Sequence, residues 1–494
     1  MKLIESAQKH ASHIAIRETN RTWTYRQLLD ASAHYAKCFL EVKGDATDRC
    51  IAYMVDPGFD YVAVQWGIWR SGSIAVPLCL SHPLPSLQYY IEDSGADTIV
   101  VSPAYAELLG DYAKESGISL FVLDGMPSPS KSLPLPDVDS SRAAMILYTS
   151  GTTSKPKGVV LSHLNLEAQM ENLIRAWEWT EKDNVLCVLP LHHVHGIVNV
   201  VCCSLMAGAS CTFIPSFSAT HVFDLFLQGE INVFMAVPTI YYKLIAHWDG
   251  LSAPEQQQLK EVMQAFRLMV CGSAALPVST MEKWEQISGH KLLERYGMTE
   301  IGMAISNPYH GERRAGYVGL PLHPVGIRLA DDFYQDVQPG ESGEILVKGD
   351  NVFKTYWNRQ DETQKAFTDE GWFKTGDVAI VEQGYFRIIG RSSVDIIKSG
   401  GYKISALEIE EQLREYSLVR DCAVVGIPNE EWGELVVAAL VADAGIDLKT
   451  LDLWLRERMP TYKTPKRYLV LEELPRNAMG KVVKNEVKIM FAKS

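Results

Sequence analysis

Short apolar runs alternate with amphipathic segments along the first part of the chain. Thr24 and Gln27 have the spacing of a capping box and predict a helix that begins there and continues to about Leu40. Tyr61–Trp69 has a helical pattern as well. The apolar runs typical of buried strands are Ile51–Val55, Ile74–Leu78, Thr98–Ser102, Leu120–Leu123 and Ala143–Leu147. This alternation predicts parallel βαβ units with helices on both faces of a sheet.

A second series of strands and helices is predicted between Val185 and Met298, with strands at Asn232–Val237 and Leu268–Cys271. The most apolar stretch, Ile197–Ile214, is interrupted by polar and glycine residues. We therefore expect a buried helix that runs into a strand, and no membrane span.

The pattern changes after Gly316, where short strands alternate with glycine-rich turns as far as Ile389. This composition predicts a small barrel-like or antiparallel section. A compact α+β unit follows, in which Ser405 and Glu408 suggest another capping box. The predicted fold class is therefore α/β, with a large N-terminal domain at 1–390 and a smaller, mobile α+β domain at 391–494.

Composition narrows the function. At 494 residues the chain is long enough for at least two domains. A formal net charge of −13 argues against nucleic acid or an anionic membrane as the main partner. The nine cysteines lack metal or disulfide spacing, and Met1–Ser6 lacks a secretory pattern, so we expect a cytoplasmic protein with reduced cysteines. The oligomeric state is left open.

The loop Tyr148–Gly158 directly follows the apolar run Ala143–Leu147 and combines hydroxyl, glycine and lysine residues. Hydroxyls and backbone amides can surround phosphate oxygens, while lysines neutralise their charge. The candidate phosphate ligands are Thr149, Ser150, Gly151, Thr152, Thr153 and Lys157. The alternative is a Ser/Thr/Gly surface turn without a ligand, but ordinary turns rarely combine these residues over such a length.

Four further segments carry candidate chemistry. In Glu294–Glu300, an aromatic ring at Tyr296 could stack on a base, Thr299 could donate to phosphate, and Glu300 could hold Mg²⁺. Asp377 lies on a predicted tight turn and suits ribose hydroxyls, although an ordinary β-turn aspartate is the alternative. The remaining two segments supply the glycine pair Gly400–Gly401 and a single C-terminal lysine, Lys481, which alone would be taken as solvated.

In this order, the five segments resemble the acyl-adenylate-forming superfamily, which contains acyl-CoA synthetases, luciferases and peptide-synthetase adenylation domains. The likeness extends from about Thr24 to Lys481. Within the superfamily the chain looks most similar to malonyl-CoA and methylmalonyl-CoA synthetases. The segments that carry this closer likeness are Leu191–Gly196, Arg267–Leu276, Leu293–Met303 and Val394–Ser405.

The resemblance implies ATP, Mg²⁺ and coenzyme A as cofactors or co-substrates. It implies that the loop Thr149–Lys157 holds the β- and γ-phosphates and that Tyr296 lines the adenine site. It further implies that Thr299 contacts the α-phosphate, that Glu300 and Thr152 coordinate Mg²⁺, and that Asp377 and Arg391 bind the ribose. Lys481 would bridge the acid carboxylate and the α-phosphate during adenylation. His193 would lie at the entrance of the acyl pocket and control access to it. A rotation of the C-terminal domain would then replace Lys481 by the Gly400–Gly401 loop.

Two positions depart from the superfamily pattern. Ser154 stands where glycine is usual, which predicts an altered phosphate loop. The hinge segment has serines at 392 and 393 and appears one residue longer than the commonest pattern.

The acid substrate depends on the acyl pocket, for which the candidates are His193, Val194, His195, Lys243, Ser273, Arg295 and Met303. A second carboxylate on a short diacid needs a cation. Lys243 is one candidate, with a surface lysine as the equal alternative. The main hypothesis is an ATP-dependent malonyl-CoA synthetase that tolerates methylmalonate. Its rivals are a coenzyme A ligase for monocarboxylic acids, an adenylation enzyme that loads a carrier protein in trans, and a non-catalytic nucleotide-binding scaffold.

Overall fold

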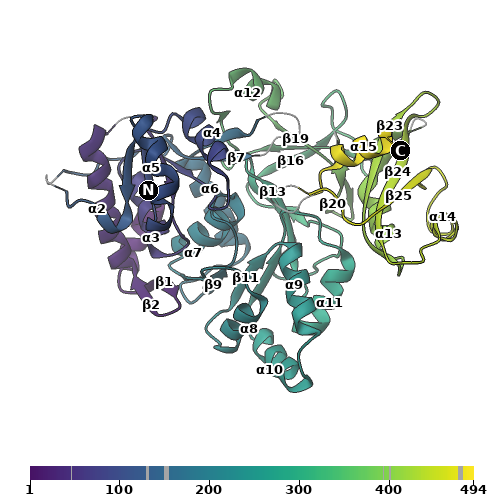
Figure 1. Cartoon of the computed structure of the whole chain (residues 1–494), viewed down its shortest axis with the longest axis horizontal. Coiled ribbons are helices and arrows are strands. Elements are labelled where there is room, and N and C mark those ends of the chain that lie inside the picture. The colour runs from purple at the N-terminus through teal and green to yellow at the C-terminus, as the bar shows by residue number, and fades with distance from the viewer. Residues whose placement is uncertain are drawn as a thin grey trace. The chain divides into compact units, whose positions relative to one another are not determined.

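The computed structural model describes residues 1–45, 47–129, 133–149, 155–392, 394–399, 402–476 and 482–493. The chain forms two compact units (Figure 1). Unit 1 comprises Met1–Ile327 and Val347–Phe373, and unit 2 comprises Arg328–Leu346 and Lys374–Ser494. The domain boundary at 390/391 stays a prediction.

A mixed seven-stranded sheet in unit 1 contains all five apolar runs predicted in the N-terminal part. Strands β3 to β6 pair in parallel, whereas β7 and β8 form an antiparallel pair. The strand order is β18 (Thr355–Tyr356), β8 (Lys157–Ser162), β7 (Ala143–Thr149), β4 (Ile74–Pro77), β3 (Cys50–Met54), β5 (Thr98–Val101) and β6 (Ser119–Val122). The predicted parallel βαβ series is confirmed.

A nine-stranded sheet forms the second layer of strands in unit 1. Its central strands β10, β9, β11, β12 and β13 are parallel neighbours. The order is β15 (Leu320–Pro321), β14 (Gly302–Ser306), β13 (Leu293–Met298), β12 (Leu268–Cys271), β11 (Val233–Ala236), β9 (Asn184–Cys187), β10 (Ser210–Phe213), β1 (Ile14–Glu18) and β2 (Arg21–Thr24). Parallel strands bring their carboxyl ends to one edge, where α/β proteins bind ligands.

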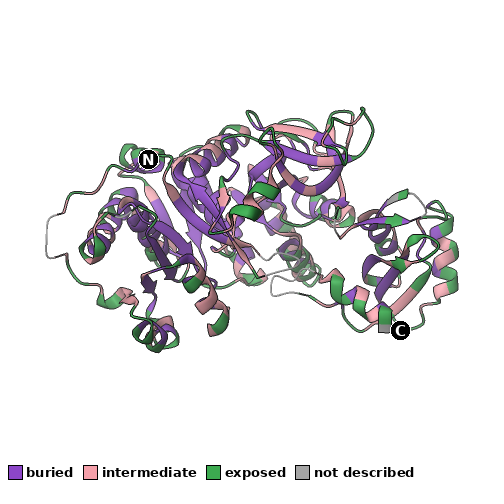
Figure 2. Cartoon of the chain, turned by 90° about the horizontal axis from the view of Figure 1, so that it is seen from above, coloured by how far each residue is buried: buried purple, intermediate pink, exposed green. Residues whose placement is uncertain are grey.

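The helices of unit 1 cover these sheets, and one of them lies deep in the unit. Helix α3 (Phe59–Arg70) is buried at every position from 61 to 69. Figure 2 shows buried segments of the chain in purple and exposed ones in green. Trp69 Nε1 donates to the Ala144 carbonyl at 2.7 Å, which ties α3 to β7. The other helices are α1 (Lys2–Lys9), α2 (Tyr25–Lys43), α4 (Leu84–Ser94), α5 (Ala106–Glu115), α6 (His163–Ala176), α7 (Cys203–Met206), α8 (Ala219–Leu227), α9 (Pro238–Trp248), α10 (Ala253–Gln264), α11 (Val278–Ser288) and α12 (Gln360–Ala366).

Local signals in the sequence set several of these elements. Thr24 and Gln27 form both hydrogen bonds of the predicted capping box at the start of α2. The apolar stretch beginning at Ile197 forms the π-helical segment η3 (His195–Cys202), then α7, and finally β10, as predicted. No helix in the described part of the chain is long and apolar enough to cross a bilayer. All nine cysteines are buried and free, as expected for core residues.

Unit 2 is built mainly around a five-stranded sheet. Its order is β22 (Tyr402–Ser405), β21 (Ile396–Ser399), β24 (Gly433–Ala442) and β23 (Val419–Asn429), with β25 (Arg467–Leu471) also paired to β24. Helices α13 (Ala406–Arg414), α14 (Leu448–Arg456) and α15 (Lys484–Lys493) complete the predicted α+β unit. Ser405 caps α13 by accepting from the Glu408 amide, but the Glu408 carboxylate binds Lys463 with both oxygens. Only the first half of this predicted capping box is therefore formed in the described structure.

The predicted antiparallel section is a four-stranded sheet. Its strand order is β16 (Gly326–Ala330), β17 (Gly343–Lys348), β19 (Phe373–Glu382) and β20 (Tyr385–Arg391). Strands β19 and β20 are antiparallel and bring Asp377 directly opposite Arg391.

His163 predicts an acid-sensitive fold. It begins α6, is 4% exposed and packs edge-on against Trp69. Burial, reinforced by the N-terminal amino group and Arg142, lowers the pKa of His163 from 6.5 to about 4. As the pH falls, His163 therefore takes up a proton in the unfolded chain before it does so in the folded chain. The free energy of unfolding decreases between pH 6.5 and pH 4, by at most about 3 kcal/mol.

Replacing His163 by Gln removes this proton uptake. We expect the unfolding free energy of His163→Gln, measured by denaturant titration at a series of pH values, to fall less steeply below pH 6.5 than that of the parent. The exposed His310 supplies the control, His310→Gln. An acid slope that is unchanged in His163→Gln would contradict the prediction.

Candidate active site

Hydrogen bonds bring three of the predicted acyl-pocket residues together: Arg295 of β13, Ser273 just after β12, and His195 of η3. Cys271 of β12 lies opposite Glu294 of β13, and Gly272 and Arg295 are the residues that follow this pair. A side chain at Gly272 would place its Cβ 2.6 Å from the Arg295 guanidinium, and the glycine therefore lets the guanidinium lie against the backbone. Arg295 Nη2 donates to Ser273 Oγ at 3.3 Å, and the Ser273 hydroxyl also bonds His195 Nδ1 at 3.1 Å.

Arg295 carries a buried positive charge. Its side chain is 3% exposed, and its Nε has no hydrogen-bond partner. None of the ion pairs among the described residues includes it. Burial lowers the pKa of Arg295 to about 10, against the opposite effect of Cys271 and Glu294, so the guanidinium keeps its charge at neutral pH. A buried charge of this kind is costly unless an anion joins it.

The neighbouring His195 is neutral. Burial, together with Arg295 and His193, lowers the pKa of His195 well below its usual value. Its Nε2 is buried without a hydrogen-bond partner in the described structure. Ser273 has a left-handed backbone conformation, with φ of 71°, and is itself exposed. The exposed serine therefore gives solvent access to one edge of this group of residues.

The remaining acid-pocket candidates lie in different surroundings. His193 is half-buried, with its ring centre 4.0 Å from that of His192, and Val194 is half-buried as well. Met303 is 1% exposed in β14. Lys243 is exposed on α9, where its ammonium lies 5.7 Å from the ring centre of Phe217. Lys243 takes no part in the contacts that join Arg295, Ser273 and His195.

The predicted phosphate loop begins at the end of β7 and leads into β8. Thr149 is the last residue of β7 and pairs with Lys157, the first residue of β8. The Lys157 ammonium forms an ion pair with Glu362 of α12 and lies 5.2 Å from the ring centre of Tyr356. Ser150, Gly151, Thr152, Thr153 and Ser154 lie outside the described residues.

Glu300 and its neighbours occupy the turn between β13 and β14. Tyr296 is buried in β13, and Thr299 is half-buried. The Glu300 side chain is 5% exposed, and one carboxylate oxygen accepts a hydrogen bond of 3.0 Å from the Tyr356 hydroxyl. A buried carboxylate suits a hard cation such as Mg²⁺, which prefers oxygen ligands. The residues present therefore fit the predicted metal.

In unit 2, the two residues predicted to bind ribose contact each other. Arg391 Nε and Nη2 donate to the two Asp377 oxygens at 2.9 and 3.3 Å. The two residues lie opposite each other on β19 and β20, so the sheet register fixes this ion pair.

Unit 2 also contains a buried ion cluster that the sequence does not indicate. Lys484 Nζ lies 2.6 Å from Asp395 and 2.7 Å from Glu410. Burial alone would lower the pKa of Lys484, but Glu410 and Asp395 outweigh it and raise the pKa. Asp395 also accepts from the Arg391 amide at 3.0 Å. Lys481, Gly400, Gly401 and Ser393 lie outside the described residues.

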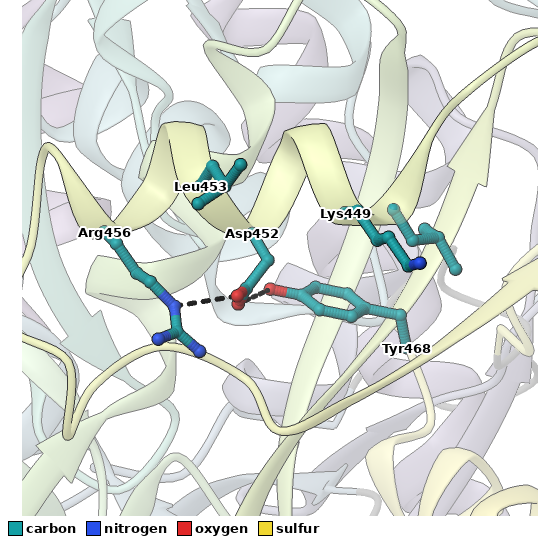
Figure 3. Close-up of a pocket in the computed structure, with 6 residues that line it drawn as sticks. Lys449, Asp452, Leu453, Arg456 and Tyr468 are labelled. Atoms are coloured by element: carbon teal, nitrogen blue, oxygen red, sulfur yellow. Dashed lines mark hydrogen bonds and ion pairs between the residues drawn. The ribbon is translucent and has the colours of Figure 1, made fainter.

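Two other features contain no predicted site residue. A shallow surface pocket of about 490 Å³ lies on α14 and β25 (Figure 3). In it, Asp452 accepts from both Arg456 and Tyr468. Near the N-terminus, His10, His13 and Glu181 bring their ligand atoms within 4.8 Å of one another, and His10 and Glu181 are 3.3 Å apart.

Sequence reasoning missed Gly272, Tyr356 and Lys484. Gly272 matters only because of the register between β12 and β13. Tyr356 is 56 residues from Glu300, and a tyrosine in a short strand carries no recognisable chemical signal. Lys484 could have been suspected, because it lies on the same short segment as Lys481.

Comparison with known proteins identifies the family of this chain. The model for AMP-binding enzymes matches residues 3–357, and the model for their C-terminal domain matches residues 408–481. The chain belongs to the AMP-binding enzyme family, and its predicted membership of the adenylate-forming superfamily is confirmed.

Individual relatives cover nearly the whole chain. The chain is 41% identical to the mitochondrial malonate–CoA ligase ACSF3 of Xenopus laevis, over 95% of this chain and 88% of that protein. ATP-bound MatB from Rhodopseudomonas palustris superposes with a TM-score of 0.89 at 31% identity, covering 99% of this chain and 98% of that one. The o-succinylbenzoate coenzyme A synthetase MenE of Bacillus subtilis, solved with ATP and magnesium ion, gives a TM-score of 0.85 at 26% identity and covers 99% of each chain.

The Lys484 cluster generates a stability prediction. Lys484→Met leaves the Asp395 and Glu410 carboxylates without their shared cation, so we expect a loss of about 3–5 kcal/mol in unfolding free energy. Lys488→Met, one turn further along α15, is the matched control. Chemical denaturation of the whole chain measures both, and equal stability of the two variants would contradict a structural role for the cluster.

Proposed function

We propose that the chain is an ATP-dependent, AMP-forming malonate–CoA ligase. The acid is first activated to an acyl-adenylate with release of pyrophosphate, and coenzyme A then takes up the acyl group and releases AMP. Family membership and the near full-length likeness to a malonate–CoA ligase support this reaction. Methylmalonate is proposed as a further substrate.

The buried Arg295 is the observation that best supports a diacid. Malonate keeps a second negative charge after its first carboxylate has reacted. A guanidinium that is buried without an ion-pair partner offers that charge two parallel donors and offsets the cost of its own desolvation. A monocarboxylic acid would leave Arg295 without an ion-pair partner. We therefore assign the distal carboxylate to Arg295 rather than to Lys243, with Ser273 as a second hydrogen-bond donor.

The neutral His195 fits the same role. Because the pKa of His195 is lowered, the ring is neutral and adds no positive charge. Its hydrogen bond with the Ser273 hydroxyl determines which ring nitrogen carries the proton. A hydrogen-bonded His195 restricts the rotation of Ser273 and so orients the serine towards the acid. His193, Val194 and Met303 are proposed to line the remaining pocket, where their size limits the length of the acid.

The nucleotide roles follow the family resemblance. The β- and γ-phosphates are assigned to Thr149, Ser150, Gly151, Thr152, Thr153 and Lys157, the adenine to Tyr296, the α-phosphate to Thr299, and the ribose to Asp377 and Arg391. Glu300 and Thr152 would hold Mg²⁺. Bound magnesium supplies positive charge beside the phosphate oxygens. Lys481 is proposed to bring the acid carboxylate and the α-phosphate together, because two anions must approach each other in this step.

The thioester step is assigned to unit 2 and its neighbouring segments. The Gly400–Gly401 loop would accommodate the narrow arm of coenzyme A, after a rotation of the domain 391–494 about the segment that contains Ser392 and Ser393.

A cytoplasmic location is kept as a proposal, and fractionation of the native cells would test it against the mitochondrial location in the name of the Xenopus relative.

A panel of acids tests the function directly. With ATP, magnesium and coenzyme A, we expect malonate and methylmalonate to release AMP and pyrophosphate, while acetate, butyrate and benzoate release much less. Chromatography of the nucleotides and a pyrophosphate assay measure both products. Release of ADP in place of AMP, or a preference for monocarboxylic acids, would refute the proposal.

Arg295→Met tests the assignment of the diacid pocket. Loss of a buried charge partner should raise the KM for malonate about 100-fold or more while the KM for ATP stays within about twofold. Since the variant also removes an uncompensated buried charge, we expect its unfolding free energy to stay equal or to increase by about 1–3 kcal/mol.

The matched variant is Lys243→Ala, which removes an exposed cation. Steady-state kinetics and denaturation of both variants separate the two candidates. If Lys243→Ala raised the KM for malonate and Arg295→Met did not, the second carboxylate would belong to Lys243.

A further inference from the structure

Tyr356 joins two residues of the proposed ATP site that are far apart in the sequence. Its hydroxyl donates to one oxygen of the Glu300 carboxylate at 3.0 Å. The Lys157 ammonium lies 5.2 Å from the centre of the same ring. Tyr356 is 9% and Glu300 5% exposed, so their hydrogen bond is largely shielded from water, whereas the Lys157 side chain is partly exposed.

The fold fixes Tyr356 at both ends. Strand β18 pairs antiparallel with β8, and Tyr356 lies opposite Val159, two residues after Lys157. Upstream, the Phe353 amide donates to the Glu300 carbonyl at 2.8 Å, so the same segment also holds the Glu300 backbone. The Tyr356 amide donates to Thr363 Oγ1 at 2.9 Å, and the Phe353 ring packs 4.7 Å from the Tyr356 ring. The ring consequently has a defined direction.

The two contacts act on opposite charges. A hydroxyl that donates to a carboxylate stabilises the ionised form and limits its rotation, and the other oxygen can then be directed at a ligand. The face of an aromatic ring attracts an ammonium group. Tyr356 therefore contacts both the ammonium and the carboxylate that the proposed magnesium triphosphate needs, and Lys157 also forms an ion pair with Glu362.

We infer that Tyr356 is a positioning residue of the ATP site. It orients the Glu300 carboxylate for the metal and supports the Lys157 ammonium for the phosphates, without contacting the reacting atoms. This inference rests on the proposed function, because it requires that Glu300 and Lys157 bind the magnesium and triphosphate of ATP.

The test separates the hydroxyl from the ring. Tyr356→Phe keeps the ring and removes the donor to Glu300. Because a hydrogen bond to a charged group changes an equilibrium about tenfold, we expect the magnesium concentration that half-saturates ATP binding to rise about tenfold. Binding of ATP without magnesium should stay within about twofold of the parent. Tyr356→Leu removes the ring as well and should weaken ATP binding both with and without magnesium.

Calorimetric titration of the purified chain measures these affinities without turnover, and the thermal unfolding midpoint verifies that each variant is folded. Tyr468→Phe is the matched control, because it removes a tyrosine hydroxyl from another carboxylate, Asp452, at 3.3 Å. This control should bind ATP and magnesium as the parent does.

The outcomes distinguish the inference from the proposed function. If the parent binds magnesium and ATP but Tyr356→Phe has the same magnesium dependence, the positioning role is wrong and the proposed function stands. If the parent binds no ATP at any magnesium concentration, the proposed function fails and the role of Tyr356 fails with it.

Discussion

The burial of the Arg295 guanidinium without an ion-pair partner is the constraint on which the acid end of the site depends. Gly272 and Arg295 directly follow the paired residues Cys271 and Glu294 of β12 and β13, and the missing side chain of Gly272 leaves room for the guanidinium against the backbone. Ser273, in a left-handed conformation, and the neutral His195 supply hydrogen bonds but no negative charge. This arrangement is costly for folding, and such a cost is expected where a site must bind an anion.

The secondary structure was largely predictable, because it follows local patterns. Apolar runs such as Ile51–Val55 became β3, and the Thr24–Gln27 capping box begins α2 as expected. The Ser405–Glu408 pattern was less reliable. Glu408 has an alternative partner in Lys463, which is 55 residues away and offers a full charge in place of a backbone amide. Local capping signals fail where a distant residue competes for the same carboxylate.

The site was predictable as a set of motifs but not as a geometry. The loop after β7 and the segment Glu294–Glu300 were identified because their residue types are chemically distinctive. The sequence did not indicate that Asp377 and Arg391 form an ion pair, since this depends on the register of β19 and β20. For the same reason Lys243 and Arg295 were both candidates for the second carboxylate. Only the tertiary structure distinguishes an exposed lysine from a buried arginine.

The anions that surround a cation distinguish the cation proposed to be structural from those proposed to bind ligands. In unit 2, Lys484 has two carboxylates within 2.7 Å. Its charge is compensated within the protein, which is what a structural role requires. In unit 1, Arg295 takes part in none of the ion pairs among the described residues, although the charge of Glu294 acts on it, and Lys157 has one partly exposed glutamate and a ring face. Phosphate oxygens can readily replace such a glutamate as the partner of Lys157, because a partly exposed ion pair contributes little to folding stability. Arg295 and Lys157 are therefore the cations that we propose for ligand binding, Arg295 for the distal carboxylate of the acid and Lys157 for the triphosphate.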